Sequence, residues 1–523
     1  MSMISSILLS LFVAALITEN YGYGYWMISR PIFAGPLIGL IMGDLNTGLI
    51  VGASVELMFM GVLPIGGSVP PNAQIAGIIG TIYAIEAHST SLGISLALPI
   101  GILAQFLIML AWNVNIYLVH RGDKAIESGN TKKMELLHLN GILVFFVIFF
   151  ISAFLAIHFG SSFVKSLNDA LPTWVSGGLS IAAGLLPAIG MAMLLKMMDF
   201  GRYWGFFLGG FVLAVYLKLN VLAVSLMGLA IAVGIAAISK TNTTSGPSET
   251  TSEDADQHLL TRKDLWHVFW RSMFTMSTMN YERYMSLGFD FAMVPVLRRL
   301  YSDKEEYIAA LKRHNEFFNC HPYTAEIVLG VSAALEEQKA LGKPITDATI
   351  TSTKTALMGP LSGIGDSIFK ATFMTIFAAI GAGLAMNGNV LGPIIFIIPN
   401  VALNLASRYL GIFWGYKFGV KLIGKMKNSD LVQKFVQGAT IVGMMVTGAM
   451  VVNFVIIKLT AKWVSAGKTI ALQSLLDQIF PSLLPLLITL LFYLGLKKNK
   501  KAIYWLMFVC FVIGLGGKFL GLL

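Results

Sequence analysis

Hydrophobic positions in this chain cluster into long, nearly continuous blocks separated by short polar segments. Four blocks are about as long as a membrane-spanning helix, at residues 141–164, 204–238, 479–496 and 502–523. Charged residues make up 12% of the chain, against roughly 25% in an average soluble domain. The pattern therefore predicts an all-α polytopic integral membrane protein. The apolar residues 1–18 are expected to form a further membrane helix rather than a cleaved signal, because no positively charged region precedes them.

Three consecutive apolar segments near the start, at 31–42, 48–63 and 74–85, are too short to cross a bilayer, and glycines and prolines interrupt them. Broken or re-entrant helices are tolerated at membrane depth only inside protein or beside a watery cavity. Transporters build substrate sites near the membrane midplane from such segments. We therefore expect a binding site in this part of the chain.

Polar residues within these segments are the first site candidates. Glu56 lies in an otherwise apolar segment, where an ionisable side chain is costly unless it is paired or functional. A structural partnership with Arg30 or with a backbone donor is the alternative for Glu56. Asn72 and Gln74 follow two prolines, and their amide groups offer both donors and acceptors suited to sugar hydroxyls.

A polar stretch, 239–261, separates two hydrophobic regions and has the low hydrophobicity of a flexible linker. It predicts two units, 1–238 and 262–523, each able to bury its own core. Within the second unit, 262–355 is expected to form largely interfacial or cytoplasmic helices, and 356–523 membrane segments.

The glycine-rich stretch 359–367 has no Lys-Ser/Thr ending and no preceding strand, so it does not fit a nucleotide-binding loop. A broken membrane helix with a polar tip is the expected structure.

The net charge of +10 does not indicate nucleic-acid binding, because basic residues sit in short loops between apolar blocks. Arg121, Lys124 and the lysines at 132–133 form one such cluster, which predicts a cytoplasmic loop. Two cysteines far apart exclude a disulfide framework and a metal site, and no cofactor is expected. The eight histidines are scattered, and each is interpreted as surface or structural.

Several motifs resemble the mannose/fructose/sorbose family of sugar phosphotransferase systems. Residues 1–238 resemble its IIC component, and 262–523 resemble its IID component. The motifs that carry the resemblance are Arg30-Pro31, Gly43–Gly48, 52–61 and Asn72-Ala73 in the first unit, and Asn280–Arg283, 287–289, 293–295, 297–301, 317–319 and 359–369 in the second. Since the family usually makes the two components as separate chains, this chain resembles a fusion.

The resemblance implies a bacterial cytoplasmic-membrane channel with an elevator-like motion, assembled as a homotrimer in lipid. Sugar passing through it would be phosphorylated by a separate cytoplasmic IIB protein. IIB receives its phosphoryl group from phosphoenolpyruvate through HPr and IIA. No phosphorylated residue or catalytic nucleophile is then expected on this chain.

Residue by residue, the resemblance places substrate-binding roles on Glu56, Asn72, Gln74, Asn280, Glu282, Arg283, Ser362 and Asp366. Their carboxylates, amides and hydroxyl would bond to sugar hydroxyls, with Arg283 as an orienting group; Glu282 and Arg283 pairing with each other is the alternative.

Two departures from the family pattern leave the sugar open. Lys370 stands where many IID relatives have an aromatic residue, and it is placed to pair with Asp366. Asn72 stands where mannose-type IIC relatives often have Asp. Two other functions compete with the phosphotransferase interpretation. One is an ion-coupled secondary sugar transporter, which also suits broken helices and a buried Glu56. The other is a receptor or scaffold to which transport is incidental.

Overall fold

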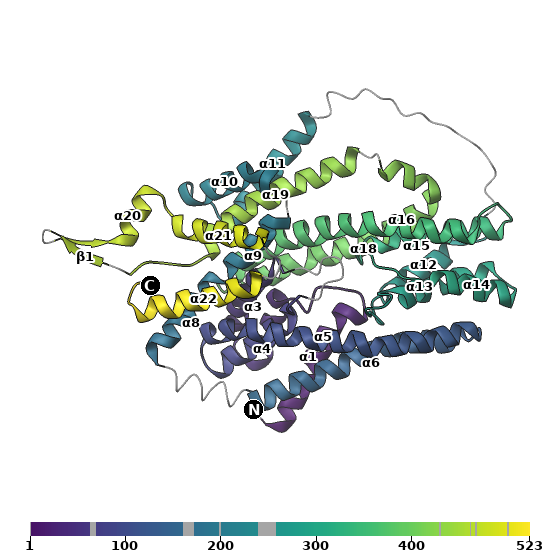
Figure 1. Cartoon of the computed structure of the whole chain (residues 1–523), viewed down its shortest axis with the longest axis horizontal. Helices are drawn as coiled ribbons and strands as arrows, with labels where there is room; N and C mark the ends of the chain where they lie inside the picture. The colour runs from purple at the N-terminus through teal and green to yellow at the C-terminus, as the bar shows by residue number, and fades with distance from the viewer. Residues whose placement is uncertain are drawn as a thin grey trace.

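The computed structural model describes residues 2–62, 70–160, 172–197, 200–238, 258–427, 430–460, 462–465, 468–498 and 502–523. These residues form an elongated bundle of helices (Figure 1). One short antiparallel hairpin, β1 (Lys462–Ser465) with β2 (Lys468–Ala471), departs from the predicted all-α class. Most of the predicted linker, 239–257, lies outside the described residues.

The first unit contains eleven described helical elements. They are α1 (Met3–Gly22), α2 (Pro31–Met42), α3 (Leu45–Phe59), α4 (Ala73–Glu86), α5 (Thr90–Glu127), α6 (Thr131–Leu155), the π-helix η1 (Ala156–Gly160), α8 (Thr173–Leu185), α9 (Pro187–Met197), α10 (Phe200–Tyr216) and α11 (Val221–Ile238).

The second unit contains a comparable set. Its described elements are α12 (Arg262–Ser272), α13 (Ser286–Leu300), α14 (Lys304–His314), α15 (Ala325–Ala340), α16 (Asp347–Gly365), the π-helix η3 (Asp366–Met374), α17 (Thr375–Ala385), α18 (Leu391–Lys427), α19 (Asp430–Phe454), α20 (Leu472–Ile479), α21 (Leu483–Lys498) and α22 (Ala502–Phe519).

Several helices are long and apolar enough to cross a membrane, which supports the predicted polytopic class. Among the described residues they are Met3–Gly22, Thr90–Glu127, Thr131–Gly160, Leu361–Ala385 and Leu391–Lys417. A sixth span is possible if α20 and α21, which bend by 79° at their junction, count as one broken span.

The short segments predicted between residues 31 and 85 are confirmed as α2, α3 and α4. Local signals set their ends. Gly43 closes α2 in the left-handed conformation, and the carboxylate of Asp44 accepts from the Thr47 backbone N–H to begin α3. α2 and α3 then pack backbone to backbone, since a Cβ on Gly35 would lie 2.8 Å from the Gly48 carbonyl oxygen.

The glycine-rich stretch 359–367 does not break the helix as expected. The chain runs from α16 directly into η3, whose wider π-helical turns begin at Asp366. Gly365 serves packing instead of a break, because a Cβ there would lie 2.4 Å from the Cβ of His321. Single π-helical turns inside α-helices often mark functional sites.

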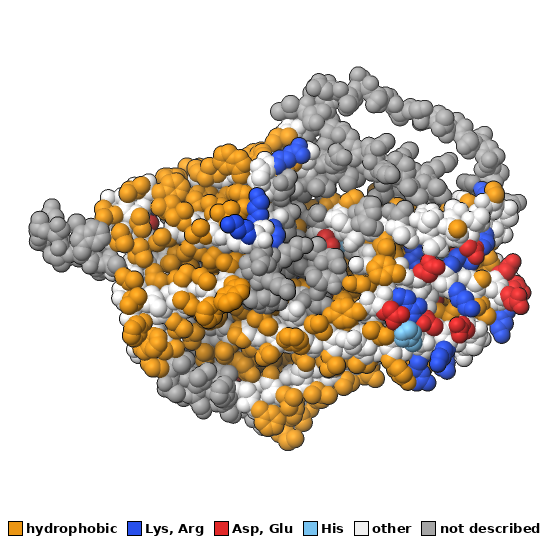
Figure 2. Space-filling view, viewed as in Figure 1, with side chains coloured by type: hydrophobic (Ala, Val, Ile, Leu, Met, Phe, Trp, Pro, Cys, Tyr) orange, Lys and Arg blue, Asp and Glu red, His pale blue; other side chains and the backbone are white. Residues whose placement is uncertain are grey.

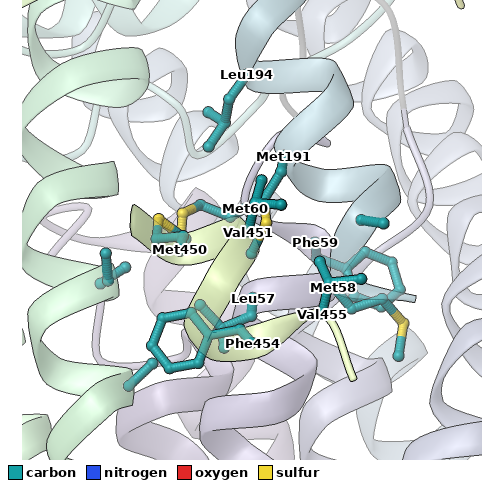
Figure 3. Close-up of a cluster of buried hydrophobic side chains, with 14 of the residues drawn as sticks. Leu57, Met58, Phe59, Met60, Met191, Leu194, Met450, Val451, Phe454 and Val455 are labelled. Carbon is teal, nitrogen blue, oxygen red and sulfur yellow. The ribbon is translucent and has the colours of Figure 1, made fainter. Parts of the chain in front are cut away.

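The two units interlock. α10 and α11 of the first unit pack along α19 of the second, and α8 packs along α22. The end of α3 meets α9 and α19 in a buried cluster that includes Leu57, Met58, Met191, Met450 and Phe454 (Figure 3). The predicted units therefore share a hydrophobic core.

Charged side chains gather at one end of the molecule, where α14 and the turn between α5 and α6 lie (Figure 2). Elsewhere on the described part of this face hydrophobic side chains predominate, with a smaller group of Lys and Arg side chains among them. The predicted basic cluster around Arg121 and Lys124 belongs to this charged end, at the last turns of α5. Such a division fits a protein whose apolar belt faces lipid and whose charged end faces water.

Candidate functional site

A cavity lies where the two units meet, between the first turn of α4, the middle of α5 and the α16–η3 rod. Its volume is about 130 Å³. Its polar and charged lining residues are Asn20, Tyr21, Tyr25, Arg30, Asn72, Gln74, Trp112, Asn319, His321, Ser362, Asp366 and Lys370.

The cavity brings together predicted site residues from both units. Asn72 and Gln74 come from the start of α4, and Ser362 and Asp366 come from the α16–η3 rod. Asn72 also begins α4, because its Oδ1 accepts from the Ile75 backbone N–H at 2.7 Å. Residues almost 300 positions apart thus face one space.

Glu56 does not line the cavity and lies fully buried behind its wall. Arg30 donates to it from Nε at 3.1 Å and from Nη2 at 2.5 Å, and the Ile32 backbone N–H donates at 3.4 Å. Arg30 itself lines the cavity. Glu56 therefore forms the ion pair with Arg30 that was the alternative interpretation for it, and its carboxylate holds the Arg30 guanidinium at the cavity wall.

Asn280, Glu282 and Arg283 are not among the lining residues. Asn280 instead organises the loop between α12 and α13. Its Oδ1 accepts from the backbone N–H groups of Glu282 and Arg283, at 3.0 and 2.9 Å. The same loop carries Met279 and Met285, which do line the cavity. Asn280 thus fixes the conformation of a loop that forms part of the cavity wall, without lining the cavity itself.

Arg283 and Glu282 contact the end of α5. Arg283 Nη2 lies 2.6 Å from Asp123 Oδ2, and Glu282 Oε2 lies 2.9 Å from His120 Nε2. The predicted pairing of Arg283 with Glu282 is looser, at 4.0 Å. These contacts join the two units at the charged end of the molecule.

Lys370 and Asp366 form the ion pair that their spacing predicts, with Nζ 3.1 Å from Oδ1. Both belong to η3 and both line the cavity. The pair keeps this part of the wall close to neutral while presenting a donor and an acceptor side by side.

Several further lining residues were not predicted as site residues, and Arg30, Trp112 and His321 are among them. Arg30 is part of a family motif and was considered only as a partner for Glu56. Trp112 lies in an apolar helix where an aromatic residue carries no distinctive signal, and His321 was interpreted with the other scattered histidines.

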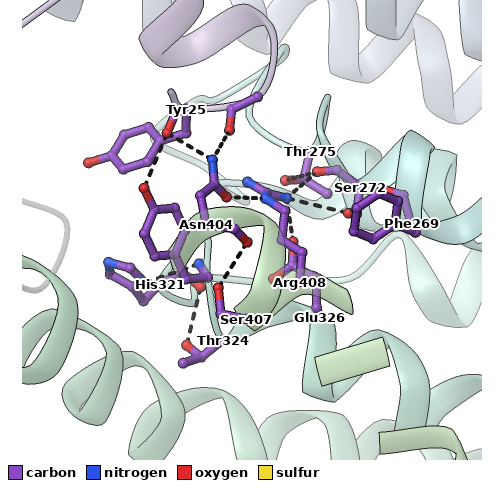
Figure 4. Close-up of polar contacts among 12 residues, drawn as sticks. Tyr25, Phe269, Ser272, Thr275, His321, Thr324, Glu326, Asn404, Ser407 and Arg408 are labelled. Atoms are coloured by element: carbon purple, nitrogen blue, oxygen red, sulfur yellow. Dashed lines mark hydrogen bonds and ion pairs between the residues drawn. The ribbon is translucent and has the colours of Figure 1, made fainter. Parts of the chain in front are cut away.

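A polar network fixes the loop that carries Tyr25 and Arg30 to the second unit (Figure 4). Asn404 on α18 donates to the carbonyls of Gly24 and Tyr25, at 2.7 and 3.1 Å. Arg408 donates to Asn404 Oδ1 at 2.6 Å and pairs with the buried carboxylate of Glu326. The loop of the first unit is thereby positioned by helices of the second.

Comparison with known families identifies the class. Residues 259–523 match the family described as the PTS system mannose/fructose/sorbose family IID component. Residues 3–234 match the family described as the PTS system sorbose-specific IIC component. The chain belongs to the mannose/fructose/sorbose family of phosphotransferase systems. It carries a IIC and a IID component fused in one polypeptide.

Two relatives from Escherichia coli (strain K12) illustrate the match. The mannose-specific EIID component is 41% identical over 281 residues, which covers 52% of this chain and 98% of the relative. The mannose-specific EIIC component is 34% identical over 206 residues, which covers 39% of this chain and 77% of the relative. A solved chain in a complex of the mannose transporter ManYZ with microcin E492 is 40% identical, covering 51% of this chain and 99% of that chain, with a TM-score of 0.31.

Family and structure together establish the general role. The chain is a multi-pass membrane component for sugar transport in a bacterial phosphotransferase system. This result supports the phosphotransferase interpretation over the ion-coupled alternative.

Proposed function

We propose that this chain imports a hexose or closely related sugar through the cavity between its IIC and IID halves. The observation that supports this most is the wall itself, which takes polar side chains from both halves. A concave cavity with a few convergent polar groups is the usual form of a small-molecule site.

The wall suits a neutral, hydroxyl-rich ligand. Amides such as Asn72 and Gln74 both donate and accept, as does the Ser362 hydroxyl, and a sugar hydroxyl does the same. Asp366 adds an acceptor and Lys370 a donor whose charges offset each other at 3.1 Å. The predicted contact residues on the wall are therefore Asn72, Gln74, Ser362 and Asp366, with Glu56 acting through Arg30.

Transport requires that the cavity open alternately to the two sides of the membrane. We propose an elevator-like motion in which α8–α11 and α19–α22 move as one body, because these helices of the two halves pack on each other. The three-fold assembly implied by the family would hold the remaining helices in place.

The phosphoryl chemistry is assigned to a partner. We propose that a cytoplasmic IIB, charged from phosphoenolpyruvate through HPr and IIA, phosphorylates the sugar as it arrives. The charged end of the molecule is the surface proposed to face IIB.

Uptake of labelled sugar in cells with and without the cognate IIB tests this function. We expect the sugar to be recovered phosphorylated, and only when IIB and phosphoenolpyruvate are present. Asp366→Asn should reduce uptake at least tenfold, as loss of a charged hydrogen-bond acceptor in a site does. Asp477→Asn, at an exposed carboxylate in α20 far from the charged end, is the matched control. Recovery of unphosphorylated sugar driven by an ion gradient would overturn the proposal.

A further inference from the structure

Two nitrogen donors on the cavity wall lack a hydrogen-bond partner among the described residues. They are Trp112 Nε1 and His321 Nε2. Trp112 is 5% exposed and His321 is 2% exposed, so bulk water does not satisfy them. Buried donors without acceptors are few in native proteins, and each needs an explanation.

The contacts of His321 define which of its nitrogens is the donor. The Tyr323 backbone N–H donates to Nδ1 at 3.1 Å. A ring nitrogen that accepts carries no proton, so the neutral imidazole carries its proton on Nε2. The ring is held in place by stacking on Phe369, with centroids 5.5 Å apart and planes at 17°. Nε2–H is thus a fixed donor at the wall.

Trp112, which belongs to the IIC half, is also held in place by aromatic packing. Its ring packs against Tyr281 at 4.8 Å and Tyr284 at 5.9 Å, both from the loop before α13. An indole nitrogen can only donate. The two halves therefore each contribute one rigid, donor-only group to the same cavity.

We propose that Trp112 and His321 are specificity-determining residues that donate hydrogen bonds to oxygen atoms of the bound sugar. The proposal rests on the proposed function and adds a chemical selection rule to it. Because both groups only donate, each requires an acceptor, so a sugar that lacks the matching oxygen leaves a buried donor unpaired. Ordered water is the competing occupant, since the cavity is roughly ten times the 10–15 Å³ that one water needs.

Equilibrium binding to the purified full chain in detergent, without IIB, tests the proposal. The probe is the labelled hexose of highest affinity among D-mannose, D-glucose, D-fructose and L-sorbose, followed by its monodeoxy analogues. Trp112→Phe removes the indole donor. His321→Asn removes the ε donor and keeps an acceptor for Tyr323, whereas His321→Gln restores an N–H near the ε position. Trp505→Phe and His267→Asn, both at exposed positions, are matched controls.

We expect Trp112→Phe and His321→Asn each to raise Kd about tenfold, the effect of one lost hydrogen bond. His321→Gln should recover part of the loss, and the controls should bind as the unmodified protein does. One monodeoxy analogue should bind the unmodified protein about tenfold more weakly than the parent sugar, yet bind Trp112→Phe no more weakly than the parent does. A different analogue should show the same coupling to His321→Asn.

The inference would be overturned if Trp112→Phe and His321→Asn bound the parent sugar and all its analogues with the same affinity as the unmodified protein. The two donors would then bind ordered water. The two substitutions test the two donors separately, so if one variant does not fold, the coupling of a monodeoxy analogue to the other variant still decides for that donor. Since binding is measured without IIB or phosphoenolpyruvate, failure of the proposed transport function is seen separately from failure of this inference.

Discussion

At the scale of single residues, charged groups near the cavity are held in pairs. Arg30 with Glu56, Lys370 with Asp366 and Arg408 with Glu326 are all mostly buried. Burying one charge without its partner is costly in a low-dielectric interior. The first two pairs therefore constrain where Arg30, Asp366 and Lys370 lie on the wall, and the third supports Asn404, which holds the loop with Tyr25.

Glu56→Gln should lower both stability and sugar affinity. Arg30 would lose its charged acceptor, and breaking a buried ion pair costs roughly 3–5 kcal/mol. The free energy of unfolding in detergent and the Kd for sugar measure the two effects. Glu56→Gln combined with Arg30→Met should be less destabilised than the sum of the single changes. Additive effects would contradict a role for Glu56 through Arg30.

Glu336 lies in α15, outside the candidate membrane spans, and gives a pH-dependent prediction. Burial alone would raise its pKa, but hydrogen bonds from Arg313 and His314, at 2.6 and 2.7 Å, outweigh burial and hold the pKa well below its ordinary value of 4.5. A carboxylate with a lowered folded-state pKa stabilises the fold above its unfolded pKa, and this contribution is lost as pH falls below about 4.5.

The thermal midpoint should therefore fall as pH is lowered from 5 to 3. Glu336→Gln should be destabilised by roughly 3–5 kcal/mol at neutral pH, because Arg313 loses its buried partner. Its midpoint should also depend less on pH over that range. Glu127→Gln, which is exposed, is the control. Parallel pH profiles for Glu336→Gln and the unmodified protein would exclude this role.

At the scale of elements, η3 organises the IID side of the cavity. Its wide turns place Asp366 and Lys370 on the wall, and the preceding Gly365 lets His321 approach the rod closely. The fit leaves no room for a side chain at residue 365.

Gly365→Ala should weaken sugar binding by about tenfold or more, because a Cβ would lie 2.4 Å from the His321 Cβ and displace the ring, a loss comparable to one hydrogen bond. Gly363→Ala, two residues earlier on the same rod, meets nothing within 4 Å and should leave binding unchanged. Equilibrium sugar binding compares the two variants. Equal effects would mean that helix propensity, not the His321 contact, decides the outcome.

The elements also show what sequence can and cannot predict here. The short helices α2, α3 and α4 were predicted because glycine and proline signals are local, although α3 begins and ends a few residues before the predicted 48–63. The Lys370–Asp366 pair was predicted because it spans one helical turn. The π-helical η3 and the partnership of Arg408 with Glu326 depend on packing between distant segments, and no local signal encodes them.

The same difference between local and long-range signals decides which site residues could be predicted from the sequence. Asn72, Gln74, Ser362 and Asp366 stood out as polar residues in apolar or family-specific surroundings, and they line one cavity. Trp112 and His321 gave no such signal, since their importance comes from lacking partners in the folded chain.

At the scale of the whole molecule, the IIC and IID halves are joined by more than the linker. α10 packs along α19, α8 along α22, and the cluster around Leu57 and Met450 belongs to both halves. Covalent fusion fixes their ratio, while the shared core holds them together.

Cutting the linker should therefore leave a working complex. A protease site placed within 239–257 should yield two chains that copurify through size-exclusion chromatography and retain sugar uptake within about twofold, because burying large apolar surfaces dominates association. An uncleaved chain carrying the same insertion is the control. Separation of the fragments under mild detergent would contradict the shared core.

The central claim is that sugar binds between the two halves. A cryo-EM map of the full chain with the highest-affinity hexose tests it most directly. The account predicts sugar density in contact with Asn72 or Gln74 on one side and Ser362 or Asp366 on the other. Sugar density enclosed by helices of only one half would contradict it.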